Sequence, residues 1–423
     1  MHPTSSFAIS PDEGRLILPP PQFTVLAATV LPLRDSITLT VHLPDSYASV
    51  SRVHLQFRVQ ITTEADCDKS IKELTYAPVR FLQANGDTVD YGLRMHHWSR
   101  LNFDADVALI DQHPAVLLTV EGAKGLRLDL TSPRFDTDVL PTENLLGGVE
   151  MMQIASARRL GMGYLFTAPT GELVMIDGGR LSKGELKGDA EQLEAILTER
   201  GGHVSDWLLT HYHADHVGAL IELLNAPNGI VIDRLWYDFS CDPQLLKLYE
   251  GGEAAMITNL ADAIQRSGKV REVHTLRKGD RVCHGNLSVT ALNDAYFLSP
   301  NNICNDSSVI LKVETPGENI LFLGDMGRYG TALLQDEAFC KEISDCMIVQ
   351  MAHHGQDGVE EVFYRALTNM KICLYPAQQW LFDCDNGEGL GSGIWESLYT
   401  RAWMRELDVR KTYNMINGHV ILR

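Results

Sequence analysis

The sequence predicts an α+β protein with two domains: a β-sandwich in residues 1–140 and, in residues 148–423, a domain in which strands alternate with helices. Two observations support this prediction. The 423 residues exceed the size of one ordinary domain. Short strand-like runs fill the first part of the chain, whereas strand and helix patterns alternate in the rest.

The first domain is predicted from its short, β-branched runs. Between Gln22 and Leu130 they include SITLTVHL, VHLQFRVQITT, AVLLTVEG and LRLDL, separated by polar turn segments such as ANGD. Many short strands with turn signals between them are typical of a β-sandwich. The sequence of this domain does not indicate its role. A segment with two prolines and a Gly-Gly pair, Ser132–Glu150, is predicted to be the linker.

In the second domain, several apolar strands end in polar residues. YLFTAPTGELVMIDGG reads as a hairpin that ends at Asp177, AEQLEAILTERGG as a helix, and DWLLT as a strand that leads to His211. SSVILKVE and NILFLGD read as paired strands, the second ending at Asp325, and DCMIVQMAHHG as a strand that leads to His353. Strand ends that share one edge of a sheet are where α/β proteins place their sites.

The densest group of polar residues is H-x-H-x-D-H, formed by His211, His213, Asp215 and His216. In an extended segment, residues i and i+2 project to the same side, so His211 and His213 can bind one cation. Asp215 and His216 begin the next helix and can face a second cation. The alternative is a solvated histidine-rich loop. Four ionisable groups between an apolar strand and an apolar helix favour a shared metal, because burying them unpaired is costly.

These residues carry a resemblance to a known family. THYHADHVGAL resembles the signature of the metallo-β-lactamase-fold hydrolase superfamily, and MIDGG, LFLGD and MAHHG are similar to its other motifs, in the same order. The run NDSSVILKVE…ILFLGD…IVQMAHHG resembles the branch of bacterial DNA-uptake channel proteins and choline-phosphate esterases. The resemblance covers about residues 148–423 and implies a four-layer αββα domain.

The resemblance also implies a site. Zn²⁺ is the expected cofactor, as one or two ions, with Mn²⁺ or iron as alternatives. Asp177 would brace the metal-binding loop, Asp325 would bridge two ions, and Asp215 would also orient a metal-activated water. The metal ligands that it implies are His211, His213, Asp215, His216, Asp325 and His353.

One position departs from the superfamily pattern. Many members place a third histidine ligand of the first metal before the bridging aspartate, where this chain has Asn302 to Ser308 and no histidine. Asn305 and Asp306 are the nearest substitutes, and Cys304 is a further candidate, for which a buried structural thiol is the favoured interpretation. The histidines of the 274–284 segment fall in what reads as an exposed hairpin.

The adjacent pair His353 and His354 is ambiguous. Side chains of neighbouring strand residues face opposite sides, so both can ligate only if the strand has already ended. The sequence interpretation gives the metal to His353 and leaves His354 as the proton donor to the leaving group.

The predicted function is metal-dependent hydrolysis by a metal-activated water, with a phosphodiester or related ester favoured by the branch resemblance. A lactam, thioester or lactone is the alternative bond. From a different class comes a metal-containing binding or sensing protein without turnover, which the missing histidine favours. Di-iron redox chemistry is a further alternative.

Composition limits the partners. A formal charge of −19 argues against broad nucleic-acid binding, so the expected partner is a small-molecule or phosphoester substrate. Eight scattered cysteines without a C-x-x-C pair predict reduced thiols rather than a disulfide scaffold. Without a signal-peptide pattern or a membrane-length apolar run, the expected location is cytoplasmic, although a trimmed secreted chain would read the same. The oligomeric state is not predicted.

Overall fold

The residues form two compact units. In the computed structural model of the chain, one unit comprises residues 1–140 with 383–412, and the other comprises residues 141–382 with 413–423. The structure describes residues 8–10, 15–18, 29–32, 35–67, 69–73, 75–77, 79–90, 92–131, 134–137, 139–141, 143–157, 160–182, 188–242, 244–246, 252–299, 302–389 and 391–423. Residues 22–28 of the predicted strand-rich region, and 132, 133, 138 and 142 of the predicted linker, lie outside these ranges.

The first unit contains two antiparallel-rich sheets. One has the order β1 (Ala8–Ser10), β2 (Arg15–Leu18), β4 (Asp35–His42), β12 (His113–Gly122), β7 (Val79–Gln83) and β8 (Thr88–Asp90), with β11 (Ala108–Ile110) on β12. The other has the order β10 (Trp98–Asp106), β5 (Arg52–Thr63), β13 (Leu126–Leu130) and β3 (Thr29–Pro32), with β14 (Arg134–Asp136) on β5.

The two sheets share one apolar core. Phe57 of β5 makes edge contacts with Phe81 of β7 and Phe103 of β10, with ring centroids 6.3 and 6.0 Å apart. All three rings are buried in the same hydrophobic cluster. Because inward-facing side chains of both sheets meet in one core, the predicted β-sandwich is confirmed.

A segment close to the C-terminus groups with this sandwich. Helix α11 (Ser397–Glu406) follows the second unit's helix α10 (Gln379–Phe382) in the chain, and its Tyr399 lies on Tyr76 of β6 (Tyr76–Ala77), with ring centroids 4.3 Å apart. Its Leu398 packs on Gly92 so closely that a Cβ at Gly92 would lie 2.8 Å from the Leu398 carbonyl oxygen. The first unit is therefore discontinuous in sequence.

The second unit contains two seven-stranded sheets. The first has the order β20 (Val270–Thr275), β19 (Val231–Tyr237), β18 (His203–Leu208), β17 (Leu173–Ile176), β16 (Tyr164–Thr167), β15 (Glu150–Gln153) and β28 (Val420–Leu422). The second has the order β21 (Arg281–His284), β22 (Leu287–Ala291), β23 (Leu311–Glu314), β24 (Asn319–Phe322), β25 (Cys346–Gln350), β26 (Ile372–Leu374) and β27 (Lys411–Tyr413). Strand β27 spans the sequence boundary between the two units, which lies after Thr412.

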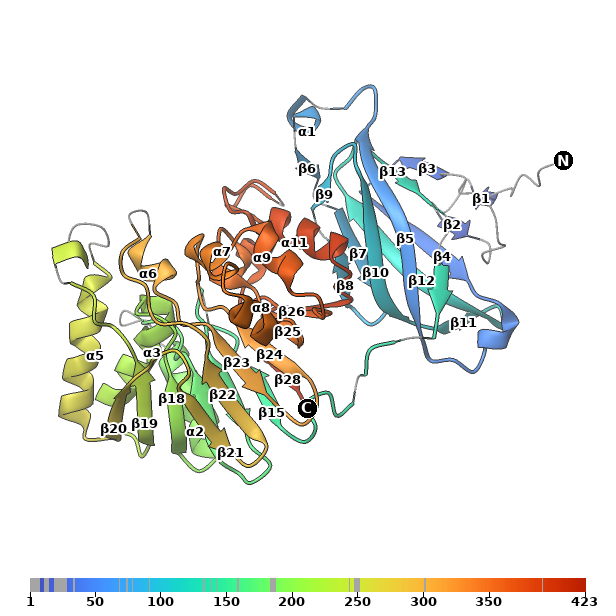
Figure 1. Ribbon diagram of the computed structural model, residues 1–423. Coiled ribbons are helices and arrows are strands. Elements are labelled where there is room, and N and C mark those ends of the chain that lie inside the picture. Colours follow the sequence, from blue (N-terminus) through green and yellow to red (C-terminus); the bar gives the residue numbers. More distant parts are fainter. Residues whose placement is uncertain are drawn as a thin grey trace. The chain divides into compact units, whose positions relative to one another are not determined.

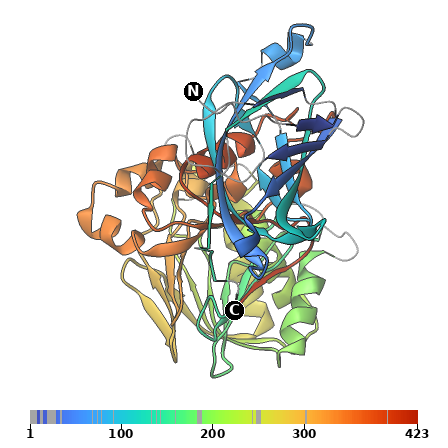
Figure 2. The ribbon, with the colours of Figure 1, turned by 90° about the vertical axis from the view of Figure 1, so that its right-hand side faces the viewer.

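Helices cover the outer faces of these sheets. Apolar residues of α2 (Asp189–Glu199), α3 (Ala214–Asn225) and α5 (Ala254–Ser267) share one core with the first sheet. Helices α7 (Tyr329–Leu333), α8 (Glu337–Ile343) and α9 (Glu361–Ala366) lie on the opposite side of the unit (Figures 1 and 2). Between the sheets, Tyr164 of β16 packs against Phe322 of β24, with ring centroids 4.7 Å apart. The predicted αββα layers are confirmed.

Strand direction brings polar residues to one edge. Strands β17 and β18 are parallel neighbours in the first sheet, and β24 and β25 are parallel neighbours in the second. The residues that follow the two strands of each pair therefore leave their sheet on the same side, and Asp325 of the second sheet reaches His211 of the first there. Across the described part of the chain, the structure contains no helix with the length and apolar character needed to cross a lipid bilayer.

Candidate metal centre

Asp325, just after β24, lies at the centre of a buried group of histidines. Its Oδ1 is 3.1 Å from Nε2 of His216, and its Oδ2 is 3.5 Å from Nε2 of His354 and 3.7 Å from Nε2 of His211. Asp215 Oδ2 lies 3.4 Å from the same His354 nitrogen. The side chains of the three histidines and Asp325 are at most 1% exposed, so this group is a closed cluster around one carboxylate.

Asp177, at the end of β17, orients two of these imidazoles from behind. It accepts hydrogen bonds from the Thr210 amide and hydroxyl and from His216 Nδ1, each 2.8 Å long. The Thr210 hydroxyl, donating to Asp177, accepts in turn from Nδ1 of His211 at 3.1 Å. Both rings thus carry their proton on Nδ1 and present Nε2 to Asp325, the arrangement that carboxylate-braced metal ligands use.

His354 is held in the same way, although its partner is a backbone group. Its Nδ1 lies 2.8 Å from the Pro376 carbonyl oxygen, which can only accept, so this nitrogen donates and Nε2 faces the cluster. His353 and His354 form the short helix η2 (Ala352–Gly355) after β25, and both have left-handed backbone angles, with φ of 49° and 58°. Such conformations are costly outside glycine and occur where the surroundings enforce them.

His353 occupies a different environment from its neighbour. Its side chain is 18% exposed, whereas that of His354 is fully buried. Its Nδ1 lies 2.8 Å from Asp357, and its ring is 3.4 Å from the amide nitrogen of Asn305. Its Nε2 is 3.8 Å from Asp325. The structure therefore brings both histidines to the cluster and gives the buried position to His354.

In this cluster, imidazoles and carboxylates that can carry opposite charges are buried next to one another. Burial, and then the neighbouring His216, hold the pKa of His211 well below its ordinary value. Burial also lowers the pKa of His354, but the carboxylates of Asp325 and Asp215 outweigh it and raise that pKa to about 9. Burial would raise the pKa of Asp325, yet the facing histidines hold it well below its ordinary range. Without a cation, protons on the imidazoles balance the carboxylates.

The donor set fits divalent cations. Nε2 of His211, His216 and His354, and Oδ1 of Asp325, are buried and make no hydrogen bond to any described residue. The potential ligand atoms lie within 4.8 Å of one another in each of two groups, His211–His216–Asp325 and Asp215–His216–His354. Imidazole nitrogens and carboxylate oxygens together suit zinc, manganese or iron. A cation shared by these three imidazole nitrogens and the carboxylate that they face would satisfy all of them.

The remaining predicted residues are spread around this cluster. His213 is the N-cap of α3, and its ring centroid lies 4.9 Å from that of His211. Asn305 stands beside His353, while Asp306 accepts hydrogen bonds from the Ser299 hydroxyl and the Tyr329 amide, away from the histidines. The two histidines of the 274–284 segment have other roles: His274 stacks on Trp236, and His284 bonds to Asp206.

Several contributors were not singled out in the sequence. Thr210 directly precedes His211 in the motif THYHADHVGAL, and this position is the signal that the sequence offers. In the structure its hydroxyl lies between Asp177 and His211. Asp357 and Arg180 are ordinary surface-type residues in the sequence. Arg180 lies 3.9 Å from Asp215 Oδ2, with its side chain 29% exposed, so a positive charge stands at the accessible side of the cluster.

Comparison with a known family agrees with this geometry. Residues 159–234 match the sequence profile of the "Metallo-beta-lactamase superfamily", a segment that contains the H-x-H-x-D-H motif and Asp177. The superfamily resemblance stated from the motifs is therefore confirmed, while the branch within it stays a prediction. No curated protein sequence matches the chain significantly.

The chain is also similar to solved structures, at low sequence identity. The metallo-beta-lactamase fold protein YhfI from Bacillus subtilis and unliganded yeast PDE1 each share 12% identity with this chain at a TM-score of 0.40, and each alignment covers 65% of this chain and 99% of the other. CmlA from Streptomyces venezuelae, a diiron beta-hydroxylase, shares 12% identity at a TM-score of 0.38 over 68% of this chain and 55% of its own. Similarity this distant says nothing about substrate.

Proposed function

We propose that this chain, identified as a member of the metallo-β-lactamase superfamily by the match of residues 159–234, is a metal-dependent hydrolase of phosphodiesters or related esters. The single observation that supports the proposal is the set of three buried imidazole nitrogens without a hydrogen-bond partner among the described residues, all facing Asp325. A solvated histidine loop would expose these nitrogens to water, and a structural cluster would pair them.

The two ends of the cluster would hold two cations. His211 and His213 would bind the first cation, and Asp215, His216 and His354 the second, with Asp325 between them. Bound there, divalent cations supply a water nucleophile at neutral pH and offset the negative charge that develops on the substrate. Asp177 contributes by fixing the two rings before the substrate arrives, so that no reorganisation is needed during the reaction.

His353 is then the group that protonates the leaving oxygen. It is the more exposed of the two adjacent histidines, and Asp357 holds its Nδ1, so that Nε2 is available to donate. Phosphodiester hydrolysis consumes one water and yields a phosphate monoester and an alcohol, and the proton given to the alkoxide comes from this imidazole. The proposal exchanges the roles that the sequence interpretation gave to His353 and His354.

Arg180 favours an anionic substrate. Its guanidinium stands 3.9 Å from Asp215 Oδ2, at the accessible side of the cluster. In a protein of formal charge −19, a local positive charge is needed to hold a phosphodiester. A lactam, thioester or lactone would make less use of this arginine.

Turnover of bis(p-nitrophenyl) phosphate tests the proposal. We expect steady release of p-nitrophenol after loading with Zn²⁺ or Mn²⁺, its loss on adding EDTA, and its recovery with fresh metal. Asp325→Ala should lose most bound metal and the activity with it, because one carboxylate serves both ions. The control Asp262→Ala, on the exposed face of α5, should retain both.

Other outcomes identify the alternatives. Activity on a thioester, a lactone or a lactam but not on the phosphodiester would transfer the proposal to that bond. Metal bound at full stoichiometry without turnover of any of these substrates would overturn the hydrolase and leave a metal-containing binding or sensing protein.

A further inference from the structure

We propose that Cys304 is a protein ligand of the first cation, so that His211, His213 and Cys304 form a His₂Cys site that selects Zn²⁺ over Mn²⁺. This inference rests on the proposed function only in that the cluster binds cations. It answers the question of what replaces the third histidine that many superfamily members carry before the bridging aspartate. Sequence reasoning favoured a packing thiol at this position.

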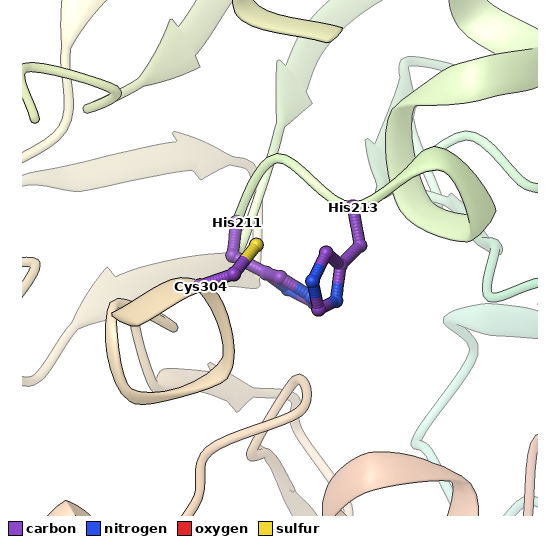
Figure 3. Close-up of side chains that lie close together, drawn as sticks. All are labelled: His211, His213 and Cys304. Atoms are coloured by element: carbon purple, nitrogen blue, oxygen red, sulfur yellow. The ribbon is translucent and has the colours of Figure 1, made fainter. Parts of the chain in front are cut away.

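The three donor atoms already lie together. Sγ of Cys304 and one ring nitrogen each of His211 and His213 are all within 4.8 Å of one another (Figure 3). Zinc holds sulfur at about 2.3 Å and nitrogen at about 2.0–2.1 Å, which places tetrahedral ligands about 3.5 Å apart. The side chains would therefore need to close by little more than 1 Å at most to bind one ion.

The backbone fixes this proximity. Cys304 lies in the short helix α6 (Ile303–Asp306), which the Asn302 side chain caps by accepting from the Asn305 amide. Directly after α6, the Val309 amide donates to the Thr210 carbonyl at 3.0 Å, and Ser308 Oγ accepts from the Asp325 amide at 3.1 Å. The segment that carries Cys304 is thus hydrogen-bonded both to the residue before His211 and to the backbone amide of Asp325.

A second observation points to a ligand at this place. Nε2 of His211 is fully buried and has no hydrogen-bond partner among the described residues, while Thr210 holds the Nδ1 of the same ring. His211 belongs both to the group with Cys304 and to the group with Asp325. A cation held between Cys304, His213 and the Asp325 side would satisfy this nitrogen.

Of the other candidates for the missing ligand, Asp306 is already engaged, and Asn305 lies at the His353 side of the cluster, with its Oδ1 buried and without a hydrogen-bond partner among the described residues. Both carboxylate oxygens of Asp306 already accept hydrogen bonds, from Tyr329 and Ser299, and the Asn305 amide lies against the His353 ring. Metal binding to Cys304 converts the thiol to a thiolate and releases its proton to solvent. Thiolate is a soft donor that suits zinc, whereas manganese and magnesium prefer oxygen, so the consequence is a metal preference.

Cobalt substitution tests the assignment through its absorption spectrum. The metal-free protein loaded with Co²⁺ should show visible d–d bands and, in addition, a near-ultraviolet thiolate-to-cobalt charge-transfer band. Cys304→Ser should lose the charge-transfer band and retain the cobalt of the second site. The matched control Cys373→Ser, which removes another fully buried thiol of the same unit, should keep the band.

A second measurement needs no variant. The X-ray absorption spectrum of the zinc-loaded wild-type protein should contain a sulfur scatterer at about 2.3 Å from the zinc.

Competition between Zn²⁺ and Mn²⁺ should show a zinc preference that falls at least tenfold in Cys304→Ser. Cobalt bound without a charge-transfer band, a band that survives in Cys304→Ser, or a zinc spectrum without sulfur would each overturn the inference and leave the hydrolase proposal intact. Failure of the wild-type protein to bind any cation would overturn both.

Discussion

At the scale of single residues, one buried carboxylate decides how the site is prepared. Asp177 adopts a left-handed backbone conformation with φ of 55° and accepts three hydrogen bonds from Thr210 and His216. An aspartate tolerates this conformation better than most residues, because its short side chain can bond locally. The strained position turns the carboxylate back toward the end of β18, where the two histidines that it orients begin.

The adjacent histidines give a prediction at the same scale. His354→Ala should remove the cation of the second site and lower the metal content from two ions per chain to about one. His353→Ala should keep both ions and lower kcat by about 10²–10⁴-fold on a diester with an alkyl leaving group. With p-nitrophenolate, which leaves without protonation, the loss should be much smaller. Metal counting and rates on the two substrates measure the difference.

An exposed histidine provides the control for the His353 and His354 variants. His203→Ala removes an exposed histidine of β18 that pairs with Asp233, and it should change neither metal content nor rate. If His353→Ala lost an ion while His354→Ala kept both, the roles proposed from burial would be reversed. Equal loss of metal in both variants would make the pair a joint ligand set.

The sequence could predict which residues converge, but not which of His353 and His354 is the metal ligand. The convergence of Asp177, His211, Asp325 and His353 on one edge was expected because each follows an apolar strand, and the structure places all four there. The alternation argument, which allowed only one of the two histidines to ligate, holds only on a strand. Here the strand ends at Gln350, and left-handed angles, which no local pattern encodes for histidine, turn the ring of His354 inward.

At the scale of elements, a second buried carboxylate joins the two sheets. Asp206 of β18 accepts from Arg234 at 2.6 and 2.7 Å and from Trp236 at 2.7 Å, both on β19. It also lies 2.6 Å from His284 Nε2 on β21 of the other sheet. The hairpin that carries His284 was expected to be exposed, yet the histidine side chain is only 12% exposed. Sequence reasoning could not find this pairing, since nothing local links residues so far apart.

This junction predicts a pH dependence of stability. Burial would raise the pKa of Asp206, but the hydrogen bonds from Arg234, His284 and Trp236 outweigh it and lower the pKa below its ordinary value. A depressed folded-state pKa contributes stability above the unfolded value of about 3.9, and the contribution is lost as the pH falls through the folded pKa. We expect Asp206→Asn to lower the free energy of unfolding by about 2 kcal/mol at pH 7.

Denaturant unfolding across pH checks the sign. The difference between the wild type and Asp206→Asn should be full near neutrality and should shrink below about pH 4. Asp233→Asn is a suitable comparison, because this carboxylate on β19 pairs with the exposed Arg271 and should matter little at any pH. A difference that persists unchanged into acid would show that packing, rather than charge, accounts for the loss.

At the scale of the whole molecule, the two units are interleaved along the chain. The sequence predicted a change of domain near residue 140, with residues 148–423 in the second domain. In the structure helix α11, within residues 383–412, groups with the sandwich. Helical spacing of apolar residues does not tell which part of the chain lies against a helix, and here Tyr399, itself 39% exposed, contacts Tyr76, some three hundred positions earlier.

Because every proposed ligand lies in residues 141–382, metal should stabilise only one of the two units. Ligands that bind the folded state alone add about 2.7 kcal/mol at a hundred times their Kd. For a unit of this size, that corresponds to a rise in Tm of about 5–10 °C. Scanning calorimetry with and without Zn²⁺ should therefore show two transitions, of which one moves. Tyr399→Ala, in the sandwich unit, should lower the metal-independent transition and leave the zinc-induced rise unchanged. If zinc raised both transitions by the same amount, the two units would unfold as one and the division drawn from their separate cores would not describe the folding of the chain.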